Sequence, residues 1–144
     1  HLLIQFRYLE RQLQKLQHEV RIDFDLMVDS DVDQNLLIPK TLIHTHVENA
    51  IKHGLLPARK GGTILVAIST TKRQTLISIR DNGIGRDPEA KPDIANGHGK
   101  GTEIIDQLIE MFYKLHKVRI TREFIDHKDP DGNPLGAEVL IRVN

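Results

Sequence analysis

The chain has 144 residues, 39% of them apolar and 28% charged, which is typical of one globular domain that buries roughly two-thirds of its unfolded surface. Its 20 basic and 20 acidic side chains balance, so no overall field attracts nucleic acid or an anionic membrane. The absence of cysteine excludes a disulfide framework and a thiolate metal site, and no apolar run approaches the ~18 residues of a membrane span. From these features we expect a soluble, cytoplasmic protein. We also expect it to be a fragment of a longer protein, because the chain begins at His1 within a helical pattern.

The first segment has a helical pattern. Apolar residues recur at steps of four and three between Leu2 and Val20, which predicts a helix with one apolar seam. This helix either packs on its own domain or forms a connector or dimer seam with other helices. We expect a connector helix at residues 1–18 and a globular domain at residues 19–144.

Alternation of apolar and polar residues predicts a half-buried strand at residues 20–28. Pro39 is well placed as the first residue of a helix that Gly54 can cap. Residues 63–70 and 75–80 alternate again and predict a hairpin.

The second half begins with a long segment, residues 82–100, that is rich in glycine and charge, as in lids and binding loops. A helix is predicted at residues 101–115, followed by strands at 118–126 and 137–143 around a turn. One side of the helix is expected to face the core, through Ile104, Ile105, Leu108, Ile109, Phe112 and Leu115. The order of elements predicts the α+β class: a two-layer α/β sandwich whose mixed sheet carries helices on one face.

The predicted helix before Gly54 carries Glu48, Asn49, Lys52 and His53. A carboxamide oxygen is a good ligand for Mg²⁺, a neighbouring carboxylate can orient a nucleophile, and a lysine can bind phosphate. The alternative is structural: Glu48 and Lys52, four residues apart, form a solvated ion pair.

Asp81 lies where a strand gives way to a turn that contains Gly83 and Gly85. A carboxylate there can accept a hydrogen bond from an exocyclic amine, and the glycines permit close approach of a ligand. The alternative is a tight turn in which Asp81 bonds its own backbone.

A second glycine cluster precedes the predicted helix at residue 101. Gly97, Gly99 and Gly101 leave backbone amides unobstructed near Thr102, and such amides at a helix N-terminus can bind phosphate.

Together, the three clusters resemble the N, G1 and G2 boxes of the GHKL superfamily, which includes histidine kinases, DNA gyrase B, MutL and heat-shock chaperone ATPases. Ile38-Pro39 followed by residues 47–54 is most similar to the catalytic domain of LytS-like sensor histidine kinases. The resemblance implies the Bergerat ATPase fold over most of the chain from Val20 onward. It also implies ATP and Mg²⁺ as cofactors.

The resemblance assigns roles to individual residues. It implies that Asn49 holds Mg²⁺, that Glu48 polarises the attacking group, and that Asp81 reads the adenine amine. Residues 86–100 would be the ATP lid. The remaining implied contacts are Lys52, His53, Gly99, Lys100, Gly101 and Thr102 with the phosphates and Gly83, Ile84 and Gly85 with the adenine.

The implied activity is transfer of the γ-phosphoryl group of ATP to a histidine on a separate dimerisation domain. The implied partners are that helical phosphoacceptor domain and a downstream response regulator, within a membrane-anchored parent protein that forms a homodimer. Two alternatives stay open: an ATP hydrolase of the gyrase or MutL type, and a nucleotide-gated interaction module without kinase chemistry.

Three features depart from the family pattern. His44-Thr45-His46 replaces a Gln-Pro-apolar sequence, Gly136-Ala137 replaces Gly-Thr, and no segment typical of a phosphoacceptor histidine is present. We expect no metal site built from histidines, because His44 and His46 point away from each other on a helix. Residues 129–140 begin like a calcium loop, but Pro134 occupies the glycine position, which favours a hairpin turn.

Overall fold

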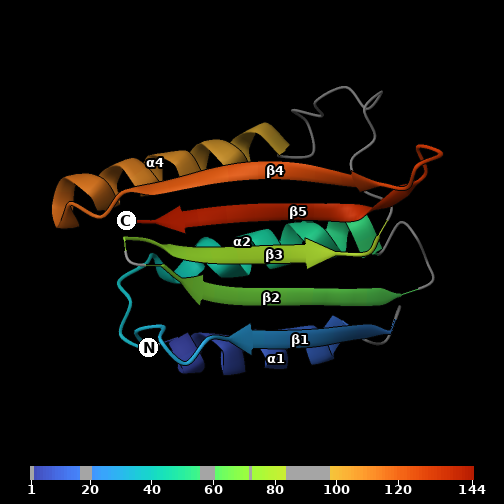
Figure 1. Ribbon diagram of the computed structural model, residues 1–144, viewed down its shortest axis with the longest axis horizontal. Helices are drawn as coiled ribbons and strands as arrows, with labels where there is room; N and C mark the ends of the chain where they lie inside the picture. Colours follow the sequence, from blue (N-terminus) through green and yellow to red (C-terminus); the bar gives the residue numbers. More distant parts are fainter. Residues whose placement is uncertain (1, 17–20, 56–60, 72, 84–97) are drawn as a thin grey trace.

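The computed structural model describes residues 2–16, 21–55, 61–71, 73–83 and 98–144. These residues form one five-stranded sheet with helices packed on one of its faces (Figure 1). The predicted α+β sandwich is therefore confirmed. The elements are α1 (Leu2–Leu16), β1 (Ile22–Val28), α2 (Lys40–Ala50), the π-helical turn η1 (Ile51–Leu55), β2 (Gly62–Thr70), β3 (Thr75–Asp81), α4 (His98–His116), β4 (Ile120–Lys128) and β5 (Pro134–Val143).

The sheet is mixed and has the strand order β1-β2-β3-β5-β4. β1 and β2 are parallel, because the chain crosses over through α2 between them, as parallel neighbours require. The other pairs are antiparallel, and β2–β3 and β4–β5 are hairpins. The last hairpin folds back so that β5, not β4, lies against β3.

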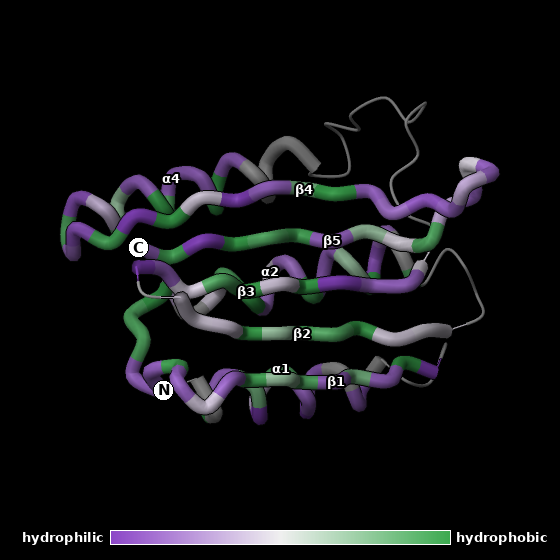
Figure 2. Tube along the Cα trace, in the orientation of Figure 1, coloured by the Kyte–Doolittle hydropathy of each residue, from purple (hydrophilic) through white to green (hydrophobic). Residues whose placement is uncertain are grey.

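The core lies between the sheet and the helices. Alternate residues of β2 and β3 face it, as their alternating sequence predicts, and α2 supplies the opposite wall. Figure 2 shows the hydrophobic residues gathered along the central strands β2, β3 and β5. The most deeply buried side chains include Leu42, Val47, Ile51, Leu55, Ile64, Val66, Ile68, Ile77, Ile79 and Ile141.

Two predictions for the ends of α2 are wrong. Pro39 is the residue before the helix, not its first residue, and the helical path does not stop at Gly54. After Ala50 it widens into η1, which runs through Gly54 to Leu55. Ile51 and Leu55 are both buried, and their four-residue spacing keeps both side chains on the core only if the chain stays helical.

The helix predicted at residues 101–115 is longer than expected. α4 begins at His98, so residues 98–100, assigned to the lid, are helical. Ile104 and Leu115 do not face the core; they are 63% and 69% exposed. The side of α4 that faces the core contains Ile105, Ile109 and Phe112. Ile104 and Leu115 belong to a second apolar row beside it, which is exposed to solvent.

The closing strands are also displaced from their predicted limits. β4 begins after Val118, at Ile120, and both strands extend further toward the turn than expected. Antiparallel pairing continues to Lys128 and Pro134, past an irregularity between His127 and Lys128.

The α1 helix packs beside β1 (Figure 1). Phe6 and Leu9 are buried in the common core, as expected of a helix that lies on its own domain. Ile4 and Tyr8 are exposed on the other side. The division into a connector helix at 1–18 and a domain at 19–144 stays a prediction. Within the part of the chain that the structure describes, no helix has the length and apolar character of a membrane span.

Candidate functional site

Asp81 is the last residue of β3 and is only 4% exposed. Burial raises the pKa of its carboxyl group above the ordinary value, and the neighbouring charge of Asp126 acts in the same direction. Hydrogen bonds from the backbone N–H groups of Gly83 and Ala137 oppose this shift. Among the described residues, no basic side chain forms an ion pair with Asp81. The described part of the site therefore holds a buried carboxyl group that no described basic side chain neutralises.

The turn after Asp81 has the geometry that the sequence predicted as the structural alternative. The Gly83 N–H donates to Asp81 Oδ1 at 2.9 Å, so the carboxylate does bond its own turn. This contact does not exhaust the group, because a carboxylate offers about four acceptor positions. Asp81 can therefore shape the turn and still accept a hydrogen bond from a ligand.

Asn82 joins this turn to β2. Its Oδ1 accepts a hydrogen bond from the Thr63 N–H at 2.8 Å, and its own N–H donates to the Thr63 carbonyl at 3.3 Å. A Cβ added to Gly62 would lie 2.4 Å from Asn82 Oδ1 and 2.5 Å from Leu55 Cδ2. Gly62 is thus the point where the end of η1 and the turn after β3 meet.

Gly136 passes against the backbone of Asp81 on the other side. It has a φ of +111°, and a Cβ there would lie 1.9 Å from the Asp81 carbonyl oxygen. Only glycine fits this close approach. Because Ala137 follows and donates to the Asp81 carboxyl group, the Gly136-Ala137 pair contributes backbone to the site, although it lacks the hydroxyl of the family's Gly-Thr.

The C-terminal half of α2 presents the second predicted cluster. Lys52 Nζ lies 3.2 Å from Glu48 Oε1, and His44 Nε2 lies 3.8 Å from Glu48 Oε2. The predicted solvated ion pair is therefore present, with half-exposed side chains. Asn49 and His53 are exposed on neighbouring positions of the helix, and Asn49 is not packed into the core.

These two clusters lie at the same end of the sheet. Figure 1 shows the last turns of α2 and η1 beside the arrowhead of β3, and η1 contacts β3. The structure thus brings the helix of Glu48 and Asn49 to the strand end of Asp81. Thr71, Arg73, Gln74 and Asn144 line a shallow depression at the opposite end of the sheet, which holds none of the predicted site residues.

The third predicted cluster is only partly described. Ile84 and Gly85, with residues 86–97 of the predicted lid, lie outside the described residues. The first turns of α4 contain Gly99, Lys100, Gly101 and Thr102. The structure describes the helical backbone of these residues but not the environment of their side chains. The first amides of a helix have no intrahelical acceptor, so the N–H groups at the start of α4 need acceptors from outside the helix, and a phosphate is one such acceptor.

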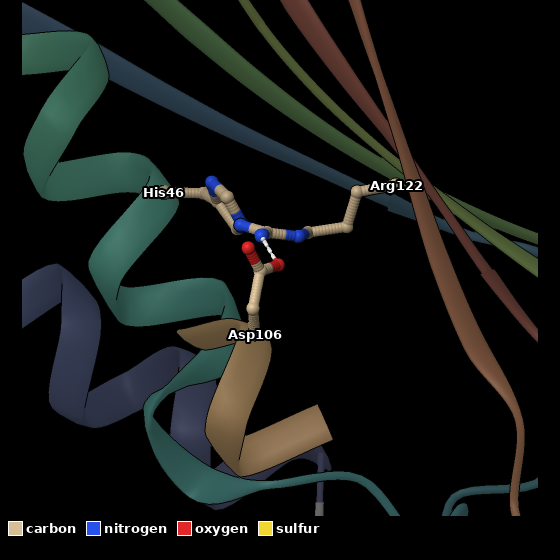
Figure 3. A network of polar contacts seen from close by, with 3 residues as sticks. All are labelled: His46, Asp106 and Arg122. Atoms are coloured by element: carbon tan, nitrogen blue, oxygen red, sulfur yellow. Dashed lines mark hydrogen bonds and ion pairs between the residues drawn. The ribbon is translucent and has the colours of Figure 1, made fainter. Parts of the chain in front are cut away.

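Sequence reasoning missed a polar network between α2, α4 and β4 (Figure 3). Arg122 forms an ion pair with Asp106 of α4, and its Nη1 lies 3.2 Å from Nε2 of His46 on α2. The Arg122 side chain is only 6% exposed. The sequence did carry a signal. Arg122 lies two residues after Ile120 and two before Phe124, so all three side chains lie on the same face of the strand, where an apolar residue is expected.

His46 is buried within this network. Burial, and then the charge of Arg122, lowers its pKa to about 4, so the imidazole is neutral at pH 7. A neutral imidazole can accept the Arg122 N–H at Nε2. His44 contacts Glu48 and Tyr8, so the two histidines face different partners, as predicted from their spacing.

These groups fit a nucleotide with a divalent cation. A buried acceptor suits an exocyclic amine, and a lysine with the amides of a helix N-terminus suits phosphates. Among the described residues there is no group of three or more metal-ligating side chains. Mg²⁺ needs fewer protein ligands where phosphates and waters complete its shell, and the exposed Asn49 carboxamide is of the right kind.

Comparison with known proteins points to the same chemistry. The model of the histidine kinase-, DNA gyrase B-, and HSP90-like ATPase family matches residues 35–143. Sensor histidine kinase YpdA of Escherichia coli (strain K12) is 32% identical over 79 residues, covering 55% of this chain and 14% of that protein. Sensor protein LytS of Staphylococcus haemolyticus (strain JCSC1435) is 30% identical over 100 residues, covering 65% of this chain and 17% of that protein.

The fold has a solved counterpart. The crystal structure of full-length ShkA in complex with AMPPNP matches with a TM-score of 0.70 and 18% identity, covering 99% of this chain and 29% of that one. The matched part of this chain covers less than a fifth of the length of YpdA or LytS. The predicted resemblance to GHKL proteins, and among them to LytS-like sensor kinases, is confirmed. The chain belongs to the histidine kinase-, DNA gyrase B-, and HSP90-like ATPase family.

Proposed function

We propose that this domain binds Mg·ATP and transfers its γ-phosphoryl group to a histidine on a separate helical domain of the parent protein. The observation that carries the proposal is the buried carboxyl group of Asp81, which forms no ion pair with any described basic side chain and lies at the strand end that η1 contacts. Family membership and the sensor-kinase relatives support the choice of reaction.

In this proposal, Asp81 selects the base. Its carboxylate accepts a hydrogen bond from the exocyclic amine of adenine, and Gly83, Ile84 and Gly85 are the residues that would contact the ring. A buried acceptor left without its donor costs free energy, so a base that lacks the amine binds poorly. Ala137 and Gly83 hold the carboxyl group in place through their backbone N–H groups.

The α2 residues act on the phosphates and the nucleophile. Asn49 would hold Mg²⁺, which neutralises phosphate charge when bound, and Lys52 with His53 would lie along the phosphates. Glu48 accepts a hydrogen bond from one ring N–H of the acceptor imidazole and so makes the other nitrogen more nucleophilic. The new P–N bond forms as the bond between the γ-phosphorus and the β–γ bridging oxygen breaks, and ADP leaves.

The amides of Gly99, Lys100, Gly101 and Thr102 complete the phosphate site in this proposal. Phosphoryl transfer requires mainly positioning and charge neutralisation, which such a site supplies. The phosphoryl group would then pass to a response regulator. The parent protein would be a membrane-anchored homodimer whose cytoplasmic part includes this domain.

The direct test is phosphorylation of the parent's phosphoacceptor domain. We expect this chain, supplied with γ-labelled ATP and Mg²⁺, to produce acid-labile phosphohistidine on that domain. Asn49→Ala should reduce transfer by about 1,000-fold, by analogy with removal of a group that stabilises the transition state. Its fold should be unchanged, because Asn49 is exposed.

Two outcomes would contradict the proposal. If Asn49→Ala transfers normally, the role of Asn49 is wrong. If the wild-type chain hydrolyses ATP steadily without an acceptor and forms no phosphohistidine with one, the domain is an ATPase and not a kinase.

A further inference from the structure

The network of His46, Arg122 and Asp106 links the two helices that would surround the nucleotide phosphates. We propose that Arg122 is a positioning residue, which fixes the start of α4 relative to the α2 residues Glu48 and Asn49. The inference rests on the proposed function, since it assigns a purpose to this coupling within the ATP site. Arg122 itself touches no substrate atom in this proposal.

The first argument is geometric. Arg122 projects from β4 into the space between α2 and α4, where its guanidinium meets one partner from each helix (Figure 3). His46 lies two positions before Glu48, and Asp106 lies in the third turn of α4. The network therefore reaches both helices close to the segments that carry predicted site residues.

The second argument is energetic. The Arg122 side chain is almost fully buried, between Ile120 and Phe124 along β4 and opposite the buried Ile141 of β5. An apolar side chain at such a position is often as stabilising as an ion pair, or more so. Stability alone therefore does not require an arginine here. A role in fixing geometry explains why a charge occupies this position.

The third argument concerns direction. A guanidinium is planar and donates in fixed directions, so it constrains two partners at once, whereas the flexible ammonium of lysine does not. Neutral His46 accepts on one side, and the Asp106 carboxylate accepts on the other. A shift of α4 along or around its axis would break the pairing with Asp106 and leave a buried cation without its carboxylate.

The consequence is specific to the phosphates. The adenine end of the site is built from β3 and β5. Arg122 lies on β4 and contacts the helices, so its loss does not remove a contact from the adenine end. The phosphate end depends on α2 and the first turn of α4 together. Loss of Arg122 should therefore weaken binding of ATP while leaving binding of adenosine almost unchanged.

The experiment measures the affinity of the whole chain for Mg·ATP and for adenosine, by calorimetry and by amide shifts at residues 81–83. We expect Arg122→Met to weaken ATP binding about tenfold, the scale of coupling found for such networks, and to change adenosine binding less than about twofold. Arg122→Lys should recover little. Asp106→Asn should act in the same direction, and adding it to Arg122→Met should have no further effect.

The matched control is Arg142→Met on the neighbouring strand. Arg142 pairs with Glu123 at 3.0 Å across β5 and β4, on the opposite face of the sheet from Arg122. It should leave both affinities unchanged.

Three results would overturn the proposal, and they can be told apart. Equal loss of ATP and adenosine binding in Arg122→Met would mean a merely structural role. ATP affinity within about twofold of the Arg142→Met control would mean no role. If Arg122→Met does not fold, Asp106→Asn decides by the same criteria, because its side chain is 62% exposed. If wild-type protein binds no ATP, the proposed function fails first, and this inference fails with it.

Discussion

The two faces of the sheet treat charged side chains differently. On the outer face, Glu123 and Arg142 pair at 3.0 Å with side chains 53% and 36% exposed. On the inner face, the Arg122 side chain and Asp81 have almost no contact with water. Exposed pairs contribute about 0 to 1 kcal/mol and can be replaced freely. Buried charges oppose folding unless they are paired, so Asp81, which forms no ion pair with a described basic side chain, points to function on the inner face.

Two carboxyl groups make the contrast sharper. Glu138, on the outer face of β5, is partly buried, which raises its pKa, but hydrogen bonds from Ser78 and His127 outweigh burial and lower it below the ordinary value. For Asp81, burial dominates and the pKa is raised, although hydrogen bonds from three backbone amides, those of Gly83, Ala137 and Asp81 itself, oppose the shift. Glu138 is thus a satisfied carboxylate. Asp81 accepts only backbone hydrogen bonds from the residues that the structure describes, and a ligand amine could add one from a donor outside the protein.

Exchange of each carboxyl group for its amide should separate these roles most strongly. Asp81→Asn should weaken ATP binding by about 100-fold, because a charge-assisted hydrogen bond to adenine is lost. Glu138→Gln, the matched control, should leave ATP binding unchanged. Calorimetric titration measures both, and equal losses in the two variants would contradict the contrast.

The same Asp81 variant should also be more stable at neutral pH. A carboxyl group with a raised folded-state pKa stabilises the fold below its unfolded pKa of about 3.8, and this contribution is lost as the pH rises through the folded value. The melting temperature of Asp81→Asn should therefore exceed that of wild type at pH 7, and the difference should shrink on acidification. A lower melting temperature at pH 7 would contradict this account of the burial.

The close approach of β5 to Asp81 predicts the next effect. Gly136→Ala should destabilise the domain by about 2 kcal/mol, because the residue has a positive φ and its Cβ would meet the Asp81 carbonyl. Gly132→Ala is the control: Gly132 also has a positive φ, of +84°, but its Cβ would meet nothing within 4 Å. Urea unfolding should show the larger loss for residue 136, and equal losses would mean that contact with Asp81 does not matter.

The buried side chain of His46, on the helix that covers the inner face, should make the stability of the fold depend on pH. The pKa of His46 is about 4 in the folded state and about 6.5 when unfolded, so unfolding takes up a proton in the interval between them. Stability should be fully present above pH 6.5 and should fall by about 1 kcal/mol between pH 6.5 and 5.5. Urea unfolding across this range should show a flatter profile for His46→Gln, and an identical profile would contradict the neutral state of His46.

The outer face should give the smallest effect. Glu123→Ala and Arg142→Met should each change the free energy of unfolding by less than about 1 kcal/mol, and a double-mutant cycle should give a coupling of about 0.5 kcal/mol. A coupling well above about 1 kcal/mol would remove the distinction between the faces.

The fold was largely predictable, because its signals are local. Alternation in residues 63–70 and 75–80 depends on neighbours in sequence and gave the central hairpin. The continuation of α2 through Gly54 was not predictable in the same way, since burial of Leu55 against the sheet overrides the capping tendency of glycine. The exposure of Ile104 and Leu115 likewise depends on how α4 lies against its neighbours.

The site divides along the same line. The motif residues around Asp81 could be singled out from the sequence because their spacing is local and resembles a known family, and their role in nucleotide binding stays a prediction. The Arg122 network was missed because Arg122 is 16 positions from Asp106 and 76 positions from His46 in the sequence. The three side chains meet only when β4 packs against both helices. Such contacts come from topology, which no local pattern reports.

The central claim is that adenine binds at Asp81 and the metal at Asn49 within one site. The most direct measurement is calorimetric titration of wild type, Asp81→Asn and Asn49→Ala with ATP and with inosine triphosphate, which lacks the amine, in the presence and absence of Mg²⁺. We predict that Asp81→Asn loses the preference for ATP but keeps the dependence on Mg²⁺, and that Asn49→Ala shows the reverse. Wild-type protein that binds both nucleotides equally, with or without Mg²⁺, would contradict the account.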